Sequence, residues 1–360
     1  MMIDRPRQLD RIYKMMMVLA LAITGIILMS NIVIPLAFAA IFAVVLNPPV
    51  VKLEKHTGRI LAIVIVLLSA FVVISLAMWF IISQLAQLVD SLPGLEEQFF
   101  ALITQTSDSI NSWLGISTEE QTQMLKEGLA NLSKYMGEVL VSTSYLAYFF
   151  VQVPIYIFLF LLYREKFKEF FLSFTTDSEL TWRKDIEGVI RGYISGLTIV
   201  VLIAGILNSI GLLLLGIDHA IFFGFLSGAL TMIPYIGITI GATLPALLAL
   251  VTKDSVWYAV GVVGVHALVQ FLEGNWITPK ITGSKISINA LAAILALLVG
   301  GKILGIAGMI LAVPCIGILK IIMSYSDSLK PFVILLEDKS PDDANLPPTE
   351  NQQKGAAHQD

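Results

Sequence analysis

One carboxylate lies in an apolar part of the sequence, where a charge is unfavourable. Glu273 is the only charged residue between Ser255 and Ile277, and an ionisable group beside a membrane span is a functional-site hypothesis by default. If it faces a cavity, the carboxylate could bind a proton or a sodium ion. A structural role is the alternative, because Glu273 precedes Pro279 and Lys280 closely enough to pair with the lysine or to cap a helix at the interface.

Neutral hydrogen-bonding side chains accompany Glu273. Gln270, Asn275 and Thr278 follow one another at positions i, i+5 and i+8, so they share only a broad face of a helix with the carboxylate. Asn208 is the corresponding polar group in an earlier apolar run. Amides and hydroxyls of this kind suit a polyhydroxylated solute, and they equally suit hydrogen bonds between membrane helices. Both interpretations stay open for these residues.

A lysine and a histidine also interrupt apolar runs. Lys302 either attracts an anion or replaces a cation in a resting state, or it snorkels to the membrane interface. His266 is interpreted as a packing residue. Neither His266 nor His219 has His, Cys or carboxylate neighbours at a metal-ligand spacing, and Cys315 is the single cysteine. We therefore expect no metal site and no cofactor.

The composition identifies the setting of these polar groups. Of the 360 residues, 56% are hydrophobic and only 14% are charged, against roughly half and a quarter in ordinary globular proteins. Several uncharged runs exceed the 20 or so apolar residues that a membrane-spanning helix needs. We therefore expect an all-α integral membrane protein, a polytopic helical bundle. No basic patch indicates a nucleic-acid partner.

Long uncharged runs and the basic residues between them set the expected topology. Met15–Val51 would measure about 55 Å as one helix, so it is expected to bend near Asn31 and Pro35 and to end at Pro48 and Pro49. Basic residues lie before and after this run, which places both its ends in the cytoplasm. The expected segments are a cytoplasmic N-terminus (1–14), N-terminal membrane spans that form a scaffold (15–89), an acidic external helical insertion (90–139), a membrane span (140–163), a cytoplasmic amphipathic connector (164–191), a transport unit (192–323) and a disordered cytoplasmic tail (339–360).

Two further runs are long and broken. Ala220–Val251 and Ile288–Met323 are too long to cross once in straight form, and each half of them is too short to cross comfortably. A re-entrant hairpin, which enters and leaves on one side, satisfies both lengths. Each run follows an ordinary span, so 192–251 and 255–323 are expected to form an inverted repeat within a bundle of about six full spans. The residues expected at hairpin tips and hinges are Pro234, Gly237, Pro279, Gly300, Gly301, Gly305 and Pro314; for the glycines, close helix packing is the alternative.

Two stretches of the sequence carry a family resemblance. The run Gln270–Gly283 (QFLEGNWITPKITG), followed by Gly300-Gly301, Gly305, Gly308 and Ala312-Val313-Pro314, closely resembles the autoinducer-2 exporter superfamily, as does Ile233–Gly237 (IPYIG) with Pro245 downstream. Where many members have a proline after the glycine-containing turn, this chain has Ile288-Asn289-Ala290. The resemblance covers roughly residues 10–330. It implies a multi-pass, homo-oligomeric permease of the bacterial inner membrane; export of the quorum-sensing signal autoinducer-2 names the family, and cation/proton antiport is ascribed to other members.

These observations favour a gradient-driven secondary transporter that exports a small polar solute such as autoinducer-2 by an elevator-like, alternating-access movement. A sodium/proton antiporter, a channel and a membrane scaffold without coupled transport stay open as alternatives. An enzyme is not expected, because no span contains paired carboxylates, a Ser/His pair or an HExxH motif, and no Walker A sequence is present. The expected partners are the solute, a proton or sodium ion, the lipid bilayer and further copies of the chain, and both termini are expected in the cytoplasm.

Overall fold

The computed structural model describes residues 5–114, 117, 119–120, 122–123, 126–127, 143–173, 181–232, 236–281, 288–326 and 329–338. Within these ranges the regular elements are helices, apart from one isolated bridge between Ile288 and Glu337. The elements are α1 (Arg5–Leu28), α2 (Ser30–Thr57), α3 (Arg59–Leu114), α5 (Thr143–Leu162), α6 (Arg164–Leu172), α7 (Thr181–Leu214), α8 (Ala220–Leu230), α9 (Ile236–Thr252), α10 (Val256–Leu272), the π-helix η1 (Glu273–Ile277), α11 (Thr278–Ile281), α12 (Ala290–Ser324) and α13 (Lys330–Leu336).

Many of these helices are apolar enough for a membrane. In the described part of the chain, Ser30–Thr57, Arg59–Leu88, Thr181–Leu214, Val256–Ile281 and Ala290–Ser324 have the length and composition of membrane spans. Shorter apolar helices cover Met16–Leu28, Phe149–Leu162, Ala220–Leu230 and Thr239–Thr252. The expected all-α, polytopic membrane fold is therefore confirmed. The segment boundaries expected from sequence stay predictions where the helices do not mark them.

The first long run is interrupted at Met29, two residues before Asn31, but it continues through Pro35, where a bend was expected, and through Pro48 and Pro49, where an end was expected. The chain breaks at Met29, between α1 and α2, and α2 then continues through Pro48 and Pro49 to Thr57. A proline inside a helix removes the donor to the carbonyl four residues earlier. Here Arg191 of α7 donates to the freed carbonyl oxygen of Val44 at 3.2 Å. A tertiary hydrogen bond thus replaces the missing helical one.

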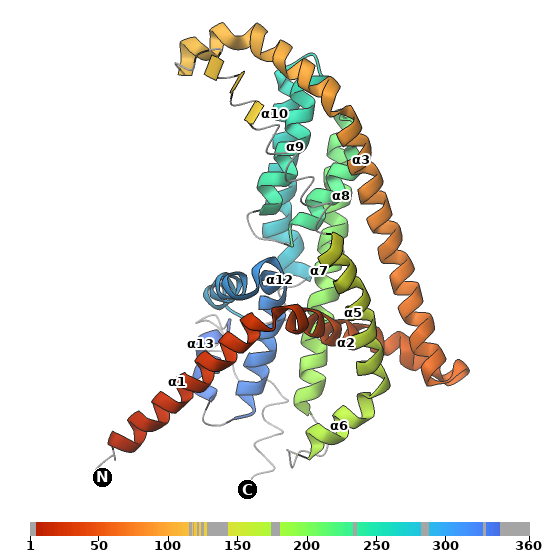
Figure 1. The fold of residues 1–360 in the computed structure, drawn as a ribbon, viewed down its shortest axis with the longest axis vertical. Helices are drawn as coiled ribbons and strands as arrows, with labels where there is room; N and C mark the ends of the chain where they lie inside the picture. Colours follow the sequence, from red (N-terminus) through yellow and green to blue (C-terminus); the bar gives the residue numbers. More distant parts are fainter. Residues whose placement is uncertain are drawn as a thin grey trace, which may run out of the picture.

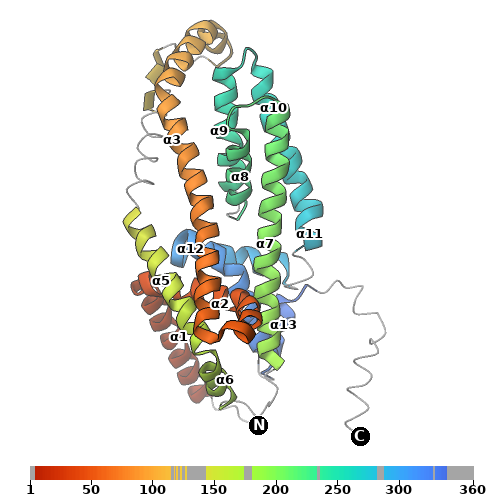
Figure 2. The ribbon, with the colours of Figure 1, turned by 90° about the vertical axis from the view of Figure 1, so that its right-hand side faces the viewer.

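Helix α3 continues without a break from its apolar, span-like part, Arg59–Leu88, to Leu114. It runs from Arg59 to Leu114, 56 residues, which is about 84 Å at 1.5 Å per residue. It is the long helix that flanks the molecule in Figures 1 and 2. Its first part packs with α2 and α5 around a buried apolar core of Ala39, Ala43, Val50, Ala62, Ile63, Val66, Val153, Ile157 and Leu161. We call these three helices the scaffold.

Helices α8 and α9 form a short hairpin against α7. Gly224 lies directly against Ser209 and Gly228 against Gly205, so α8 runs back along α7. Helix α9 then returns beside α8. With 11 residues, α8 is only about 16 Å long, roughly half the hydrocarbon thickness. The chain from Ala220 to Thr252 is thus a helical hairpin with one short arm, which we call the first hairpin; its re-entrant course stays a prediction.

Helix α12 consists of two arms that meet at Gly305. This glycine has φ 62° and ψ −144°, which interrupts the helix. Gly300 and Gly308, on opposite sides of the break, lie directly against each other, so the chain folds back at this point. We call this element the second hairpin. In both ribbon views it lies below the first hairpin (Figures 1 and 2).

Candidate functional site

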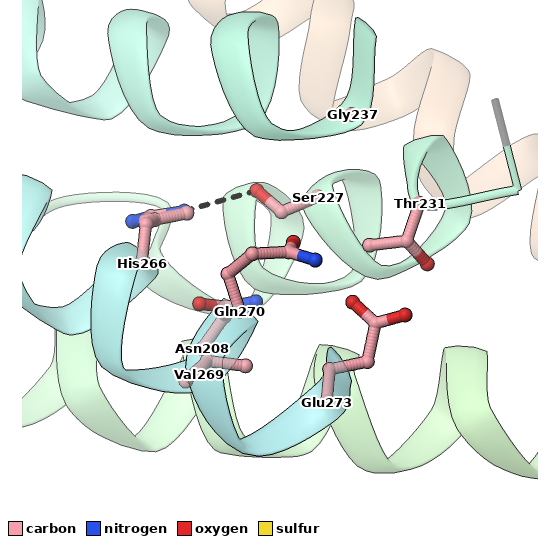
Figure 3. Close-up of a pocket in the computed structure, with 8 residues that line it drawn as sticks. All are labelled: Asn208, Ser227, Thr231, Gly237, His266, Val269, Gln270 and Glu273. Carbon is pink, nitrogen blue, oxygen red and sulfur yellow. Dashed lines mark hydrogen bonds between the residues drawn. The ribbon is translucent and has the colours of Figure 1, made fainter. Parts of the chain in front are cut away.

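A small polar cavity lies where α7, α8, α9 and α10 meet. Its volume is about 10 Å³, which is room for a single water molecule or a bare ion. Figure 3 shows its lining, drawn from all four helices: Asn208, Ser227, Thr231, Gly237, His266, Val269, Gln270 and Glu273. The cavity therefore lies at the tip of the first hairpin, inside the apolar second half of the chain.

Close helix packing brings these residues together. Gly211 of α7 lies against Val265 of α10, and Gly261 of α10 lies against Leu215 after α7, so the two helices run antiparallel. On α10, the side chains of His266, Gln270 and Glu273 follow one another at i, i+4 and i+7, which places them on one face. That face looks across the cavity to Ser227 and Thr231 of the first hairpin (Figure 3).

Glu273 occupies an irregular part of its helix. It begins η1, a five-residue π-helix between α10 and α11, and single π-turns inside helices are frequent at functional sites. Its Oε1 accepts a hydrogen bond from the Thr278 hydroxyl at 3.4 Å. Its Oε2 is buried and has no hydrogen-bond partner among the described residues. One oxygen of this carboxylate is therefore held in place, and the other is available to a ligand.

Asn208 supplies a second oxygen of the same kind. The residue is only 3% exposed, and its Oδ1 has no hydrogen-bond partner in the described structure. Buried polar atoms are nearly always hydrogen-bonded, and an exception calls for a reason such as an ion or a water molecule at the site. Two unpartnered acceptors at one cavity, one of them a carboxylate oxygen, form a suitable place for a small cation or a proton.

Ser227 joins the two arms of the first hairpin. Pro245 in α9 lacks an N–H, which deprives the Gly241 carbonyl of its helical donor. The Ser227 hydroxyl lies 3.0 Å from that carbonyl oxygen, 3.1 Å from Nε2 of His266 and 2.7 Å from the Phe223 carbonyl oxygen of its own helix. The other ring nitrogen, Nδ1, lies 2.9 Å from the Val262 carbonyl oxygen. One hydroxyl thus connects α8, α9 and α10 beside the cavity.

Comparison with known proteins places the chain in a family of transport proteins. Residues 16–327 match the family described as AI-2E family transporter. The chain belongs to the AI-2E family. It is 29% identical to YrrI of Bacillus subtilis (strain 168) over 314 residues, which cover 83% of this chain and 88% of YrrI. It is 24% identical to the AI-2 transport protein TqsA of Escherichia coli (strain K12) over 340 residues, which cover 91% of this chain and 96% of TqsA. This AI-2E protein is thus a multi-pass membrane protein with a transport role.

The cavity of this AI-2E protein brings together some of the residues singled out from sequence. Asn208, Gln270, Glu273 and the hairpin glycine Gly237 all line it. Thr278 contacts it only through its hydrogen bond to Glu273. These residues lie on α7, α9, α10, η1 and α11, so the sequence could name them but could not show that they share one space.

Other residues singled out from sequence lie elsewhere in the AI-2E protein. Asn275 is exposed and bonds to the Phe271 carbonyl of its own helix. Lys280 lies over the Trp276 ring, 5.9 Å from its centroid. Lys302 is exposed on the first arm of α12. The remaining hinge residues are distributed as follows: Pro279 lies in α11, Gly300, Gly301, Gly305 and Pro314 lie in α12, and Pro234 falls outside the described residues.

Sequence reasoning missed Ser227, Thr231 and His266 as members of the site. His266 was read as a packing residue, although it precedes Gln270 by four residues and Glu273 by seven, a spacing that marks one helix face. Ser227 had no such signal, because its role depends on the carbonyl that Pro245 frees in a different helix. The histidine could have been found from its spacing, whereas the serine needed the packing of α8 against α9.

Proposed function

We propose that this AI-2E protein is a gradient-driven secondary transporter whose coupling cation, a proton or a sodium ion, binds beside Glu273. The observation that carries the proposal is the pair of buried, unpartnered oxygens, Glu273 Oε2 and Asn208 Oδ1, at the tip of the first hairpin. Broken helices near the middle of the membrane hold substrate and coupling ions in many secondary transporters. Gln270 and Thr231 supply further polar groups at this cavity.

The transported solute is proposed to be small and polar, with autoinducer-2 as the first candidate. Support comes from the similarity to the AI-2 transport protein TqsA, which extends over nearly the full length of both chains. The cavity of about 10 Å³ is far smaller than a furanosyl solute, so on this proposal the solute binds only after the hairpins move apart.

The proposed movement is elevator-like, with the second half of the chain moving against the scaffold. The scaffold has its own apolar core, and a second core joins α7, α8, α9 and α10, with residues such as Leu212, Phe222, Phe223, Ala249 and Val262. The two bodies meet at a smaller buried cluster of Ile41, Ile190 and Leu311, so on this proposal the movement changes the packing at that cluster. We further propose an inner-membrane location with cytoplasmic termini, and a homo-oligomer.

Sodium/proton antiport is the second candidate function. It is favoured by one specific observation, the size of the cavity, because the space beside Glu273 and Asn208 fits an ion without any movement. Monovalent cations also suit a site with a single carboxylate. Among the described residues, no group of three or more His, Cys, Asp or Glu side chains gathers that could hold a transition metal.

Flux in proteoliposomes tests the proposal. Purified full-length protein is reconstituted, and uptake of autoinducer-2 and of ²²Na⁺ is measured with and without an imposed proton or sodium gradient. We expect gradient-driven uptake of at least one probe, lost in Glu273→Gln and retained in Glu169→Gln, whose carboxylate is exposed on α6. Flux that ignores the gradients and carries current would replace the carrier with a channel. Absence of flux for both probes would reject the proposed function.

A further inference from the structure

His266 is buried among apolar helices, and both of its ring nitrogens lie within hydrogen-bond distance of a polar group. The residue is 6% exposed. Its Nδ1 lies 2.9 Å from the Val262 carbonyl oxygen and its Nε2 lies 3.1 Å from the Ser227 hydroxyl. A carbonyl oxygen only accepts hydrogen bonds, so Nδ1 carries a proton. The protonation state of Nε2 then decides the charge of the ring.

With a neutral His266, the hydrogen bonds among His266, Ser227 and Gly241 have one proton fewer than their acceptors need. In that state Nε2 carries no proton and can only accept a hydrogen bond, so it needs the Ser227 hydroxyl as its donor. The Gly241 carbonyl oxygen, 3.0 Å from the same hydroxyl, needs it too, because Pro245 has removed its helical donor. One hydroxyl has one proton. The Phe223 carbonyl oxygen, 2.7 Å from the hydroxyl, competes as well, but it lies inside α8, where a backbone N–H is its donor. Of Nε2 and the Gly241 carbonyl, whichever loses the competition is left buried without a donor, which is unfavourable.

A doubly protonated His266 leaves the Ser227 proton for the carbonyl oxygens, because Nε2 no longer needs it. Nε2–H donates to Ser227 Oγ, and the Ser227 hydroxyl then donates to the Gly241 carbonyl. Since Ser227 lies on α8 and Gly241 on α9, the proton on His266 also fixes the hydrogen bond that joins the two arms of the first hairpin. Binding and release of one proton thus change the connection at the tip of this hairpin.

An imidazolium in this position needs an anion, because a buried charge is stable only when it is compensated. Glu273 lies on the same face of α10, seven residues and about 10 Å along the axis, and Gln270 lies between the two side chains (Figure 3). Among the described residues, His266 and Glu273 are the two titratable ones that line the cavity. Helices α7 and α9 both pack on α10. Helix α9 carries no ionisable side chain. The last ionisable side chain along α7 is Tyr193, about 22 Å along the helix from Asn208.

We propose that His266 is a second proton-binding residue of the cavity, paired with Glu273 as an imidazolium and a carboxylate. With the proton bound, the cavity carries no net charge and the hairpin arms are joined. With the proton released, the cavity carries the carboxylate charge alone and takes a cation in its place. The inference rests on the proposed transport function for its purpose, but proton binding can be measured without transport.

Nuclear magnetic resonance of the imidazole nitrogens tests the pairing. Full-length protein labelled with ¹⁵N-histidine is placed in lipid nanodiscs, and the four histidines are resolved with the help of His266→Gln. We expect His266 to have both nitrogens protonated at pH 7, and to become neutral with a bare Nε2 in Glu273→Gln. A neutral His266 in both proteins from pH 5 to pH 8 would overturn the proposal. If His266→Gln fails to fold, the single histidine signal that responds to Glu273→Gln makes the assignment.

A transport assay separates this inference from the proposed function. Glutamine at position 266 keeps a hydrogen-bond donor near Ser227 but cannot bind or release a proton. We therefore expect proton-driven flux in proteoliposomes to fall at least tenfold in His266→Gln. The control is His56→Gln, at an exposed histidine of α2, in which the flux should stay unchanged. Coupled flux that survives in His266→Gln would reject the inference while the proposed function stands. An imidazolium signature in a protein without any flux would reject the function while the proton site stands.

Discussion

The two hairpins of the second half break their helices in similar ways but surround the breaks differently. The first hairpin turns beside a cavity lined by Ser227, His266 and Glu273, and two buried oxygens there have no partner among the described residues. At the second hairpin, Gly300 and Gly308 lie backbone to backbone across the turn at Gly305. The first turn encloses polar groups, whereas the second is closed by direct packing of its arms.

The difference shows that a broken helix is not a site by itself. Both turns leave backbone groups without helical partners. What distinguishes the first is that α7 and α10 contribute polar side chains to its tip. Those side chains remain incompletely hydrogen-bonded, which is unfavourable unless a ligand or proton completes them. We therefore expect substitutions in the second hairpin to act on stability, and substitutions in the first to act on transport.

The largest effect is expected from filling the close contact in the second hairpin. A side chain at position 308 would overlap the Gly300 carbonyl oxygen, and backbone cannot move aside as a side chain can. Gly308→Leu should therefore lower the free energy of unfolding by about 3 kcal/mol, the upper end of overpacking. The measurement is the melting temperature of purified protein in detergent.

The matched control for that variant is Gly264→Leu in α10. No atom lies within 4 Å of the position a Cβ would take there, so the melting temperature should change little. Equal losses in the two variants would mean that the second hairpin is not closed by the contact between Gly300 and Gly308.

A smaller effect is expected at the turn of the second hairpin itself. Gly305 combines φ 62° with ψ −144°, a conformation that residues with a Cβ rarely adopt, and space around it is open. Gly305→Ala should destabilise the protein by about 2 kcal/mol through backbone strain alone. Gly274→Ala, at a glycine that also has open space but no positive φ, should be neutral or slightly stabilising. The measurement is thermal unfolding of the two variants under the same conditions. An unchanged melting temperature in Gly305→Ala would show that the turn of the second hairpin does not need glycine at this position.

The sequence predicts the fold class of this protein better than it predicts where the individual helices end. Length and apolar composition predict a polytopic helical bundle, and the proline and glycine positions predict two broken segments. The helix breaks were harder to place. Pro48 and Pro49 look like an end, yet α2 continues because Arg191 satisfies the Val44 carbonyl from another helix. A bond between residues so far apart in the chain has no local signal.

The candidate site shows the same limit. Asn208, Gln270 and Glu273 stand out in the sequence because polar groups are rare in apolar runs. Their convergence at one cavity depends on the antiparallel packing of α7 and α10 and on the depth of the first hairpin. Ser227 could not be recognised without knowing that Gly241 faces it. Sequence therefore identifies polar groups that need an explanation, and packing decides which of them act together.

Removal of the unpartnered amide beside the first hairpin should change stability in the opposite direction to the variants of the second hairpin. Asn208→Leu removes a buried oxygen that has no partner in the described structure and replaces the amide by an apolar group of similar shape. We expect the protein to become more stable by about 1 kcal/mol, because the penalty of a buried, unsatisfied polar atom disappears. Cation-coupled flux in proteoliposomes should fall at least tenfold at the same time. Loss of stability with unchanged flux would make Asn208 a structural residue and would remove the functional contrast between the hairpins.

The smallest effect is expected from the hydroxyl that joins the arms of the first hairpin. Ser227→Ala deletes the hydroxyl that bonds to the Gly241 carbonyl and to the Phe223 carbonyl of its own helix, and a net hydrogen bond contributes about 1 kcal/mol. Thr243→Val is the matched control, since its hydroxyl bonds only within its own helix, to the Thr239 carbonyl. Melting temperatures should therefore fall by a few degrees in Ser227→Ala and stay nearly constant in Thr243→Val. Because the same hydroxyl also contacts His266, the pH dependence of flux should shift in Ser227→Ala as well. A variant that loses stability without any shift in pH dependence would show that the serine holds the hairpin together but takes no part in proton binding.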